Sequence, residues 1–280
     1  MNVKIPCQNE WTQTGTDCMN NEPAQELRRP GLSRTITGFL LFGAALLAAA
    51  SAASESGLGL DADSIATGRF SYITSLQIGS IDSQIESVRE ISADRVDGRP
   101  SLRIETITVT GMGETVDLLQ LDAASLYPLQ RRISQDSGRM ELEYAADRVT
   151  GLIQAAGQLI SVDLALAEPA YAGDAGLDTL LLGLPLREGL SGELRAIETD
   201  VDVYVQRFSF AVDAAEMVET PAGRFDIWPV RIQAIDDPDY RQTVWLSKQL
   251  PRLFVQAEAP VPADAGGGVV LTQLAAIDGD

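Results

Sequence analysis

The segment 203-VYVQRFSFAV-212 decides the fold class, because its side chains alternate between two chemically different sets. One set is mainly apolar and occupies positions 204, 208, 210 and 212, while the other includes Arg207 and Ser209. Successive residues of a β-strand point to opposite faces of the sheet, so this alternation is typical of a half-buried strand. The segment therefore predicts a strand that turns aromatic side chains toward a core.

Similar alternation recurs along the chain on both sides of this segment. It is found at residues 102–109, 140–144, 160–166, 225–232, 242–247, 253–257 and 269–274. Between two of these strands, Thr220-Pro221-Ala222-Gly223 places Pro and Gly where a type I turn favours them, which indicates a hairpin. Spacings of about 10–15 residues between strands suggest an antiparallel meander. The sequence predicts a mainly β fold, an antiparallel curved sheet or incomplete barrel with one or two short helices packed against it.

One segment has helical periodicity instead. Its four leucines, Leu177, Leu180, Leu181 and Leu184, are spaced i, i+3, i+4, i+7 and would form one apolar stripe. Asp174 is a suitable N-cap and Pro185 a suitable stop signal. We expect this helix to bury its apolar face against the sheet. Residues 80–92 fit either a helix or a strand.

The N-terminal region has the features of an export signal. The apolar run 36–50 follows Arg28, Arg29 and Arg34 and precedes the small residues 50–52, which is the order of a cleavable signal peptide. We predict a signal over 1–52, with Met19 as an alternative start. The alternative is an uncleaved membrane anchor, although the run is short for a spanning helix. The prediction is a periplasmic protein with no stable transmembrane anchor after cleavage.

The rest of the chain reads as one domain. Residues 53–66 are small and polar, and we expect them to form a flexible lead-in. Residues 67–280 contain no linker and no internal repeat, so we predict a single β-rich domain there.

The composition excludes several classes of function. The chain has no histidine, which removes catalytic triads and histidine-ligated metals. Its two cysteines, Cys7 and Cys18, lie within the predicted signal, so no thiolate remains for a metal or a disulfide. The net charge of −19 opposes binding to nucleic acid. We expect no cofactor and no bound metal.

For each group of residues that could be catalytic, a structural interpretation is better supported. Paired carboxylates occur at Asp61 with Asp63 and at Asp200 with Asp202, but an acidic chain contains such pairs by chance. The cluster Asp236, Asp237 and Asp239 lacks the spacing of a calcium-binding loop and suits a solvated hairpin tip. Lys248 lacks the serine spacing of a Ser-Lys nucleophile pair. We therefore predict that the protein is not an enzyme.

The aromatic residues form the most informative set. Five of them fall in neighbouring predicted strands and could line an apolar pocket, with the leucine-rich helix as a lid. The candidate wall residues are Tyr204, Phe208, Phe210, Trp228 and Trp245, and the candidate lid residues are Leu177, Leu180, Leu181 and Leu184. The alternative is that both sets simply pack in the core.

Three segments of the C-terminal half resemble a known family. They are LPLREG at 184–189, VETPAGRFD at 218–226 and VWLSKQLPRLFVQ at 244–256, followed by a strand that ends in Thr-Gln-Leu. They resemble a family of exported bacterial proteins that is classed only as a domain of unknown function. That family is distantly similar to the lipoprotein-sorting carriers LolA and LolB. The resemblance implies an incomplete antiparallel barrel with helices in its mouth, and it implies no catalytic residues.

Three functions remain open on these grounds. The favoured one is a non-enzymatic envelope protein that binds an apolar ligand, such as a lipid or an acyl chain, within a curved sheet. The second is a structural or adaptor module that contacts another envelope protein. The third is a carboxylate-based hydrolase, which would need two carboxyl groups in one cleft.

Overall fold

The protein is described by a computed structural model that covers residues 58–278, apart from 156, 175, 200–201 and 238. All of them belong to one compact unit. The second unit, Val3–Ser56, lies outside the described residues, as do both cysteines and the predicted export signal.

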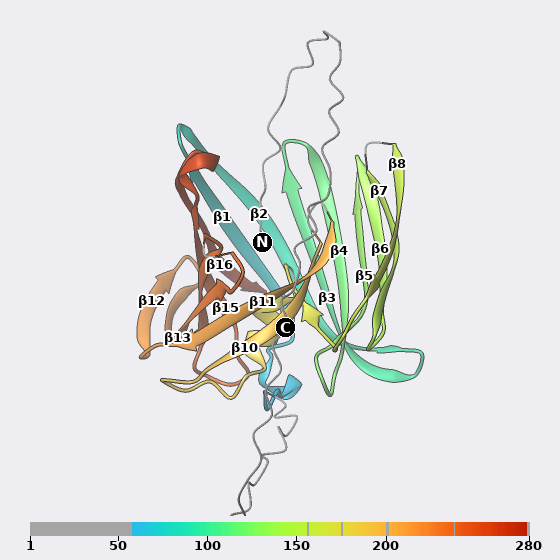
Figure 1. The fold of residues 1–280 in the computed structure, drawn as a ribbon. Helices are drawn as coiled ribbons and strands as arrows, with labels where there is room; N and C mark the ends of the chain where they lie inside the picture. The colour runs from blue at the N-terminus through green and yellow to red at the C-terminus, as the bar shows by residue number, and fades with distance from the viewer. Residues whose placement is uncertain (1–57, 156, 175, 200–201, 238, 279–280) are drawn as a thin grey trace, which may run out of the picture. The chain divides into compact units, whose positions relative to one another are not determined.

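The unit is built almost entirely from strands (Figure 1). The first eight strands are β1 (Gly68–Ile78), β2 (Ile81–Val96), β3 (Arg99–Thr110), β4 (Gly113–Asp122), β5 (Pro128–Gln135), β6 (Gly138–Tyr144), β7 (Arg148–Ala155) and β8 (Gln158–Ala165). The others are β9 (Tyr171–Ala172), β10 (Ser191–Thr199), β11 (Val203–Val212), β12 (Glu216–Thr220), β13 (Gly223–Ala234), β14 (Arg241–Ser247), β15 (Phe254–Val261) and β16 (Gly268–Asp278). Helix α1 (Leu177–Leu182) and two 3-10 turns, η1 (Ala62–Ser64) and η2 (Ala263–Ala265), complete the unit.

All sixteen strands belong to one sheet. Its order is β8-β7-β6-β5-β4-β3-β2-β1-β16-β15-β14-β13-β11-β10-β9, and β12 pairs with β13. The chain thus runs outward from β1 to β8 through hairpins, crosses to the far end, and returns until β16 pairs with β1. Every pairing is antiparallel except that of β9 with β10. The predicted antiparallel sheet is therefore confirmed.

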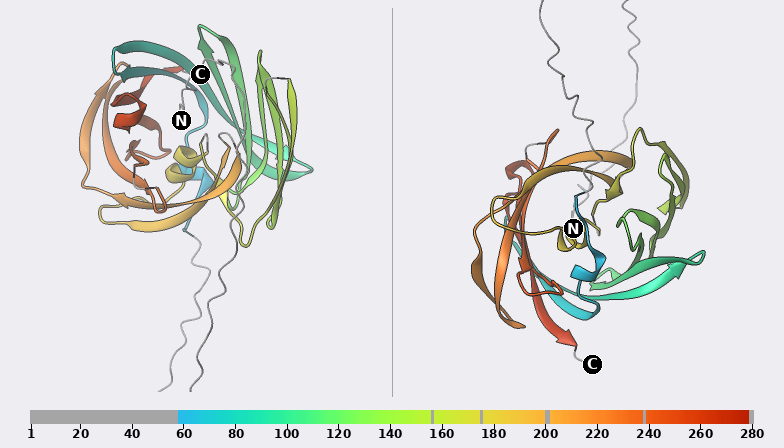
Figure 2. Two further views of the ribbon diagram at one scale, coloured as in Figure 1. Left: turned by 45° about the horizontal axis from the view of Figure 1, so that its top comes forward. Right: turned by 90° about the horizontal axis from the view of Figure 1, so that it is seen from below.

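The sheet is curved and open (Figure 2). Among the described residues, β8 and β9 share no ladder of hydrogen bonds, so the sheet does not close into a barrel. Side chains nevertheless bridge the two ends. Val162 and Leu166 from the β8 end pack with Ile197 of β10 and with Val203 and Val205 of β11 in a second hydrophobic cluster.

The alternating patterns correspond to the strands observed. The quoted segment 203–212 is strand β11, and the turn after Thr220 forms the β12–β13 hairpin, in which Thr220 pairs with Gly223. The ambiguous stretch 80–92 lies in strand β2 from Ile81 onward.

Helix α1 confirms the predicted helix but not its cap. The N-cap is Gly176, not Asp174. A Cβ atom at Gly176 would lie 3.0 Å from Leu119 Cδ2 and 2.5 Å from Ala172 Cβ, so this position has no room for a side chain. The Asp174 carboxylate instead accepts hydrogen bonds from Thr199. The helix ends at Leu182, three residues before the predicted stop at Pro185.

The stretch expected to be a flexible lead-in also differs from the prediction. Ser64, Ile65 and Ala66 are buried, and Leu58 and Leu60 pack against the main core. The backbone N–H of Asp61 donates to the carbonyl of Gly183 over 2.9 Å. Residues 58–66 therefore belong to the folded unit, because their few apolar side chains are all used in the core.

Within the described part of the chain, no helix has the length and apolar character needed to cross a membrane.

Candidate functional site

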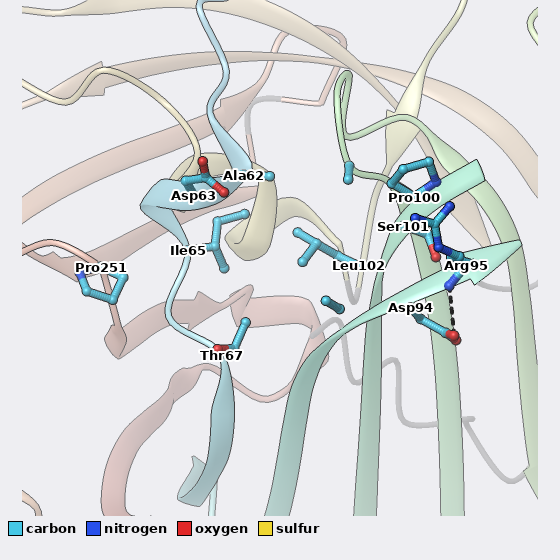
Figure 3. A pocket seen from close by; sticks show the side chains of 12 residues that line it. Ala62, Asp63, Ile65, Thr67, Asp94, Arg95, Pro100, Ser101, Leu102 and Pro251 are labelled. Atoms are coloured by element: carbon cyan, nitrogen blue, oxygen red, sulfur yellow. Dashed lines mark hydrogen bonds between the residues drawn. The ribbon is translucent and has the colours of Figure 1, made fainter. Parts of the chain in front are cut away.

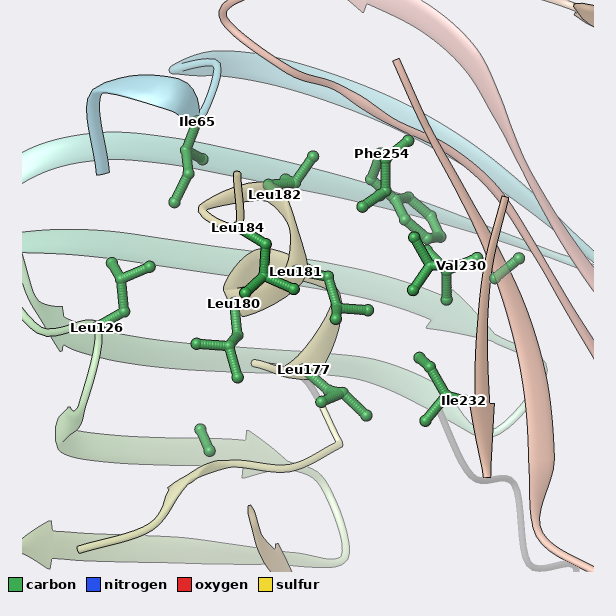
Figure 4. Close-up of a cluster of buried hydrophobic side chains, with 14 of the residues drawn as sticks. Ile65, Leu126, Leu177, Leu180, Leu181, Leu182, Leu184, Val230, Ile232 and Phe254 are labelled. Carbon is green, nitrogen blue, oxygen red and sulfur yellow. The ribbon is translucent and has the colours of Figure 1, made fainter. Parts of the chain in front are cut away.

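Helix α1 lies inside the curve of the sheet, and its leucines form the centre of the main core (Figure 4). Leu177, Leu180 and Leu181 are at most 4% exposed, as is Leu184 just beyond the helix. Their neighbours in this core come from strands on both sides of β1, including Leu119. The six-residue helix thus acts as a plug that fills the inner face of the sheet.

Three of the five aromatic candidates join the same core. Phe208 and Phe210 are 0% and 3% exposed. Trp228 is half-buried against the core, and Lys248 Nζ lies 4.9 Å from the centre of its ring. Together with the four leucines, seven of the nine candidates contact one hydrophobic core.

The other two aromatic candidates lie elsewhere. Trp245 is adjacent in its strand to Val244 and Leu246, which are both buried in the core, so it points to the opposite face. Its Nε1 donates to Glu216 Oε1 over 2.7 Å. Tyr204 is 38% exposed, at the start of β11. The alternation within one strand shows which of its residues share a face, but it does not show which face of the neighbouring strand lies on the same side of the sheet.

Arg89 of β2 binds helix α1. Its Nη1 lies 2.5 Å from Asp178 Oδ2, and both side chains are only 13% exposed. The guanidinium also stands 5.7 Å from the ring centres of Tyr72 and Phe254. Burial opposes the charged form, but the nearby Asp178 carboxylate outweighs it and raises the pKa of Arg89. Burial raises the pKa of Tyr72 as well.

Arg131 of β5 binds the segment just before the helix. It forms a two-pronged ion pair with Asp117, at 3.1 and 2.8 Å, and reaches Asp174 at 3.3 Å and the Thr199 hydroxyl at 2.7 Å. Burial tends to raise the pKa of Asp174, but hydrogen bonds with Glu198 and Thr199 and the charge of Arg131 hold it well below its usual range. Asp174 is therefore a carboxylate at neutral pH.

Arg252, between β14 and β15, binds the other end of the helix. Its Nη1 donates to the carbonyl of Leu182 over 2.9 Å, and its backbone N–H donates to Ser64 over 2.6 Å. Burial lowers the pKa of this arginine. Arg89, Arg131 and Arg252 thus tie the plug to three separate parts of the sheet and its loops.

Sequence reasoning missed these three arginines. A usable signal was present in part, because Asp117 and Arg131 occupy strand positions in phase with buried Leu119 and half-buried Ile133. A charged residue in the apolar phase of a strand is costly to bury unless it is paired, so it indicates an internal partner.

A pocket of about 730 Å³ opens beside η1 (Figure 3). Three segments form it, namely residues 62–67, 93–95 and 100–102, with Ala123 and Pro251. Its apolar wall includes Ile65 and Leu102, which are also members of the main core. None of the nine candidate residues lines this pocket, so the ligand site predicted at those positions stays a prediction.

Five of the twelve residues that line the pocket are polar or charged. Asp63, Asp94, Arg95 and Thr67 are exposed at its walls. Ser101 is only 2% exposed, and its hydroxyl has no hydrogen-bond partner among the described residues. A buried hydroxyl without a partner is unfavourable and therefore needs an explanation.

Two of the acidic residues considered as catalytic or calcium-binding groups have structural roles. Asp61 caps η1, since its Oδ1 accepts from the Asp63 N–H and its Oδ2 from the Ser64 hydroxyl. Asp236 pairs with Arg207 on the surface. Asp200 lies outside the described residues. In the described ranges, no group of three or more carboxylate, thiol or imidazole side chains is placed to hold a metal ion.

Comparison with known proteins places this chain within a family. No curated protein is similar to it. A crystal structure of a protein described as exported, with a YmcC-like fold, from Bacteroides fragilis aligns at a TM-score of 0.32 and 11% identity, covering 77% of this chain and 98% of that one. A protein from Parabacteroides distasonis described as a lipoprotein aligns at 0.28 and 7%, with the same coverage.

These low TM-scores lend nothing to the assignment of function. The family match is stronger, because it spans residues 72–268, from β1 to β16. The predicted membership in a family of unknown function is thereby confirmed, whereas the similarity to LolA and LolB stays a prediction. The chain belongs to the family of proteins of unknown function DUF3108.

Proposed function

We propose that this protein is a non-enzymatic protein of the cell envelope that binds an apolar ligand, such as a lipid or an acyl chain, in the pocket beside η1. One observation carries the proposal: the apolar wall of the pocket is the outer layer of the main core. Ile65 and Leu102 belong to both. An apolar chain seated there would extend the core and be removed from water.

The size of the pocket supports this proposal. Its volume of about 730 Å³ lies within the range of about 300–1,000 Å³ that is usual for small-molecule sites. Seven of its twelve lining residues are apolar, and polar groups beside an apolar wall can fix the orientation of a ligand. The envelope location rests on the predicted export signal.

The plug gives the pocket a way to enlarge. Residues 62–67 form one wall of the pocket. This stretch is linked to the end of the helix in two ways: the backbone N–H of Asp61 donates to the carbonyl of Gly183, and Arg252 donates both to the Ser64 carbonyl and to the Leu182 carbonyl. Movement of α1 would therefore move this wall. We propose that α1 and its leucines act as an inner lid, which is the role predicted for them.

The proposal is tested by native mass spectrometry of the protein purified from its own cell envelope without detergent, followed by organic extraction. We expect a co-purifying mass of an amphiphile with an acyl or alkyl chain. Ala93 is exposed at the pocket wall, so Ala93→Trp should obstruct the pocket and abolish the extra mass. Gln84→Trp, at an exposed position on the same strand, is the matched control and should retain it. A bare polypeptide in the wild type would count against a stable ligand.

An adaptor function is the second candidate, and exposed apolar residues near the free edge of the sheet favour it. Leu152, Leu159 and Ile160 are 43%, 64% and 46% exposed in strands β7 and β8. Exposed apolar side chains beside an unpaired edge strand are typical of protein–protein contacts. In-cell cross-linking from residue 159 should then capture one envelope protein, and Leu159→Glu should abolish the capture.

A further inference from the structure

We propose that the ligand of the pocket is an amphiphile with a zwitterionic head group, which carries one cationic and one anionic group. This inference rests on the proposed function, because it assigns the head group of the ligand whose apolar chain lies against Ile65 and Leu102. It is drawn from the charges and the unpaired hydroxyl around the same pocket.

The pocket holds one available charge of each sign. Asp63 belongs to η1, and Arg95 lies near the end of β2. The Asp63 carboxylate makes no hydrogen bond or ion pair with the described residues. Arg95 Nη1 donates to the carbonyl of Gly98 over 2.8 Å, and no described carboxylate forms an ion pair with its guanidinium. Figure 3 shows the two residues on opposite sides of the pocket.

The second carboxylate of the pocket is already engaged. Asp94 Oδ1 accepts from the backbone N–H of Arg95 over 2.7 Å, and Oδ2 accepts from Gln120 Nε2 over 2.8 Å. Its charge is thus partly satisfied by the protein. Asp63 and Arg95 remain as the groups free to bind an ammonium and a phosphate or carboxylate, respectively.

Ser101 provides an observation independent of the charges. It lines the pocket and is buried, and its hydroxyl lacks a partner among the described residues. A buried hydroxyl without a hydrogen bond is unfavourable relative to a satisfied one. A polar head group bound in the pocket would offer this hydroxyl the partner that it lacks.

The alternatives fit this arrangement less well. A fatty acid would satisfy Arg95 but leave Asp63 without a cation, within a chain whose net charge of −19 repels anions. A simple alkylammonium would satisfy Asp63 but leave Arg95 without an anion. A head group with both charges satisfies both residues.

The test is a calorimetric titration of the full chain with four amphiphiles that share a 12-carbon chain, each below its critical micelle concentration. They are dodecylphosphocholine, dodecyl maltoside, dodecanoate and dodecyltrimethylammonium. We expect the zwitterionic compound to bind about fivefold more tightly than each of the others, which is the scale of one partly exposed ion pair. A zwitterionic compound that binds no better than the maltoside would overturn the inference while leaving the proposed function intact.

Two charge variants sharpen this test. Arg95→Gln should lower the affinity for dodecanoate and dodecylphosphocholine and leave the affinity for dodecyltrimethylammonium unchanged. Asp63→Asn should leave the affinity for dodecanoate unchanged. Arg99→Gln and Asp82→Asn, at exposed positions outside the pocket, are the controls and should change nothing. If both pocket variants lower the affinity for all four compounds equally, Arg95 and Asp63 do not bind the head group. If the wild type binds none of the four compounds, the proposed function fails as well.

Discussion

The plug region and the outer arm of the same sheet are stabilised in different ways. The plug region comprises α1 and the inner face around it, and it joins residues far apart in the chain, such as Tyr72 with Phe254 and Arg89 with Asp178. The outer arm comprises β6–β8, whose core residues Met140, Leu142 and Val149 follow one another through short hairpins.

Charged pairs differ in the same way between the two regions. In the arm, Arg148 and Asp163 pair across β7 and β8 with 55% and 58% of their side chains exposed. In the plug region, Arg131 pairs with Asp117 while only 6% and 16% exposed. An exposed pair is screened by water and contributes little, whereas a buried pair becomes costly when one partner is lost. Interactions between residues far apart in the chain are therefore found mainly around the plug and not in the hairpins of the arm.

The largest effect should come from removing the buried arginine. Arg131→Met would leave Asp117 and Asp174 without their cation, and we expect a loss of about 3–5 kcal/mol in the free energy of unfolding. Arg148→Met is the matched change in the arm and should alter stability little. Urea denaturation of both variants measures the difference. Equal losses would contradict the distinction between the two regions.

A slightly smaller effect is expected from truncating the plug. Leu181 is fully buried, so Leu181→Ala should cost about 2–5 kcal/mol through lost burial and a new cavity. Leu152, on β7 of the arm, is 43% exposed, and Leu152→Ala should cost less than about 1 kcal/mol. Thermal unfolding of both variants gives the comparison. If Leu181→Ala lowers stability no more than Leu152→Ala does, the plug is not the structural centre of the fold.

Acid should destabilise the protein in part through Asp174. The pKa of Asp174 is held below its usual range in the folded state, mainly against the effect of burial, by hydrogen bonds and by Arg131. A depressed pKa contributes stability above the unfolded pKa of about 4, and this stability is lost as the pH falls toward the folded value.

The measurement is the free energy of unfolding between neutral pH and about pH 3. Asp174→Asn should be less stable at pH 7 and should lose less on acidification than the wild type. The control is Asp63→Asn, at an exposed position that forms no described ion pair, and its stability at pH 7 should match that of the wild type. Identical acid limbs for Asp174→Asn and the wild type would argue against the buried network.

The smallest effect is expected on the outer face. Trp245→Phe removes the hydrogen bond from Nε1 to Glu216 and keeps most of the ring, so stability should fall by less than about 1 kcal/mol. The ligand occupancy seen by native mass spectrometry should not change. Loss of the ligand in this variant would instead place the binding site on the outer face.

Much of the local structure could be predicted from sequence. The strand over 203–212, the hairpin after Thr220 and the helix from Leu177 were all predicted, since each depends on neighbouring residues. The predicted N-cap at Asp174 was wrong. The N-cap is Gly176, where tight packing against Leu119 and Ala172 leaves no room for a side chain. The pocket was not predicted, since its walls come from segments around Ile65, Leu102 and Pro251.

By itself, the sequence determined the strands, the turns, the plug helix and the classes of chemistry that the missing histidine excludes. The reason is physical: alternation and helical spacing follow from the local geometry of the backbone. Only the tertiary structure decided that Trp245 faces away from Phe208, that three arginines converge on α1, and that a pocket opens beside η1. These features depend on which strands become neighbours and on the register between them, and neither is encoded within any single segment.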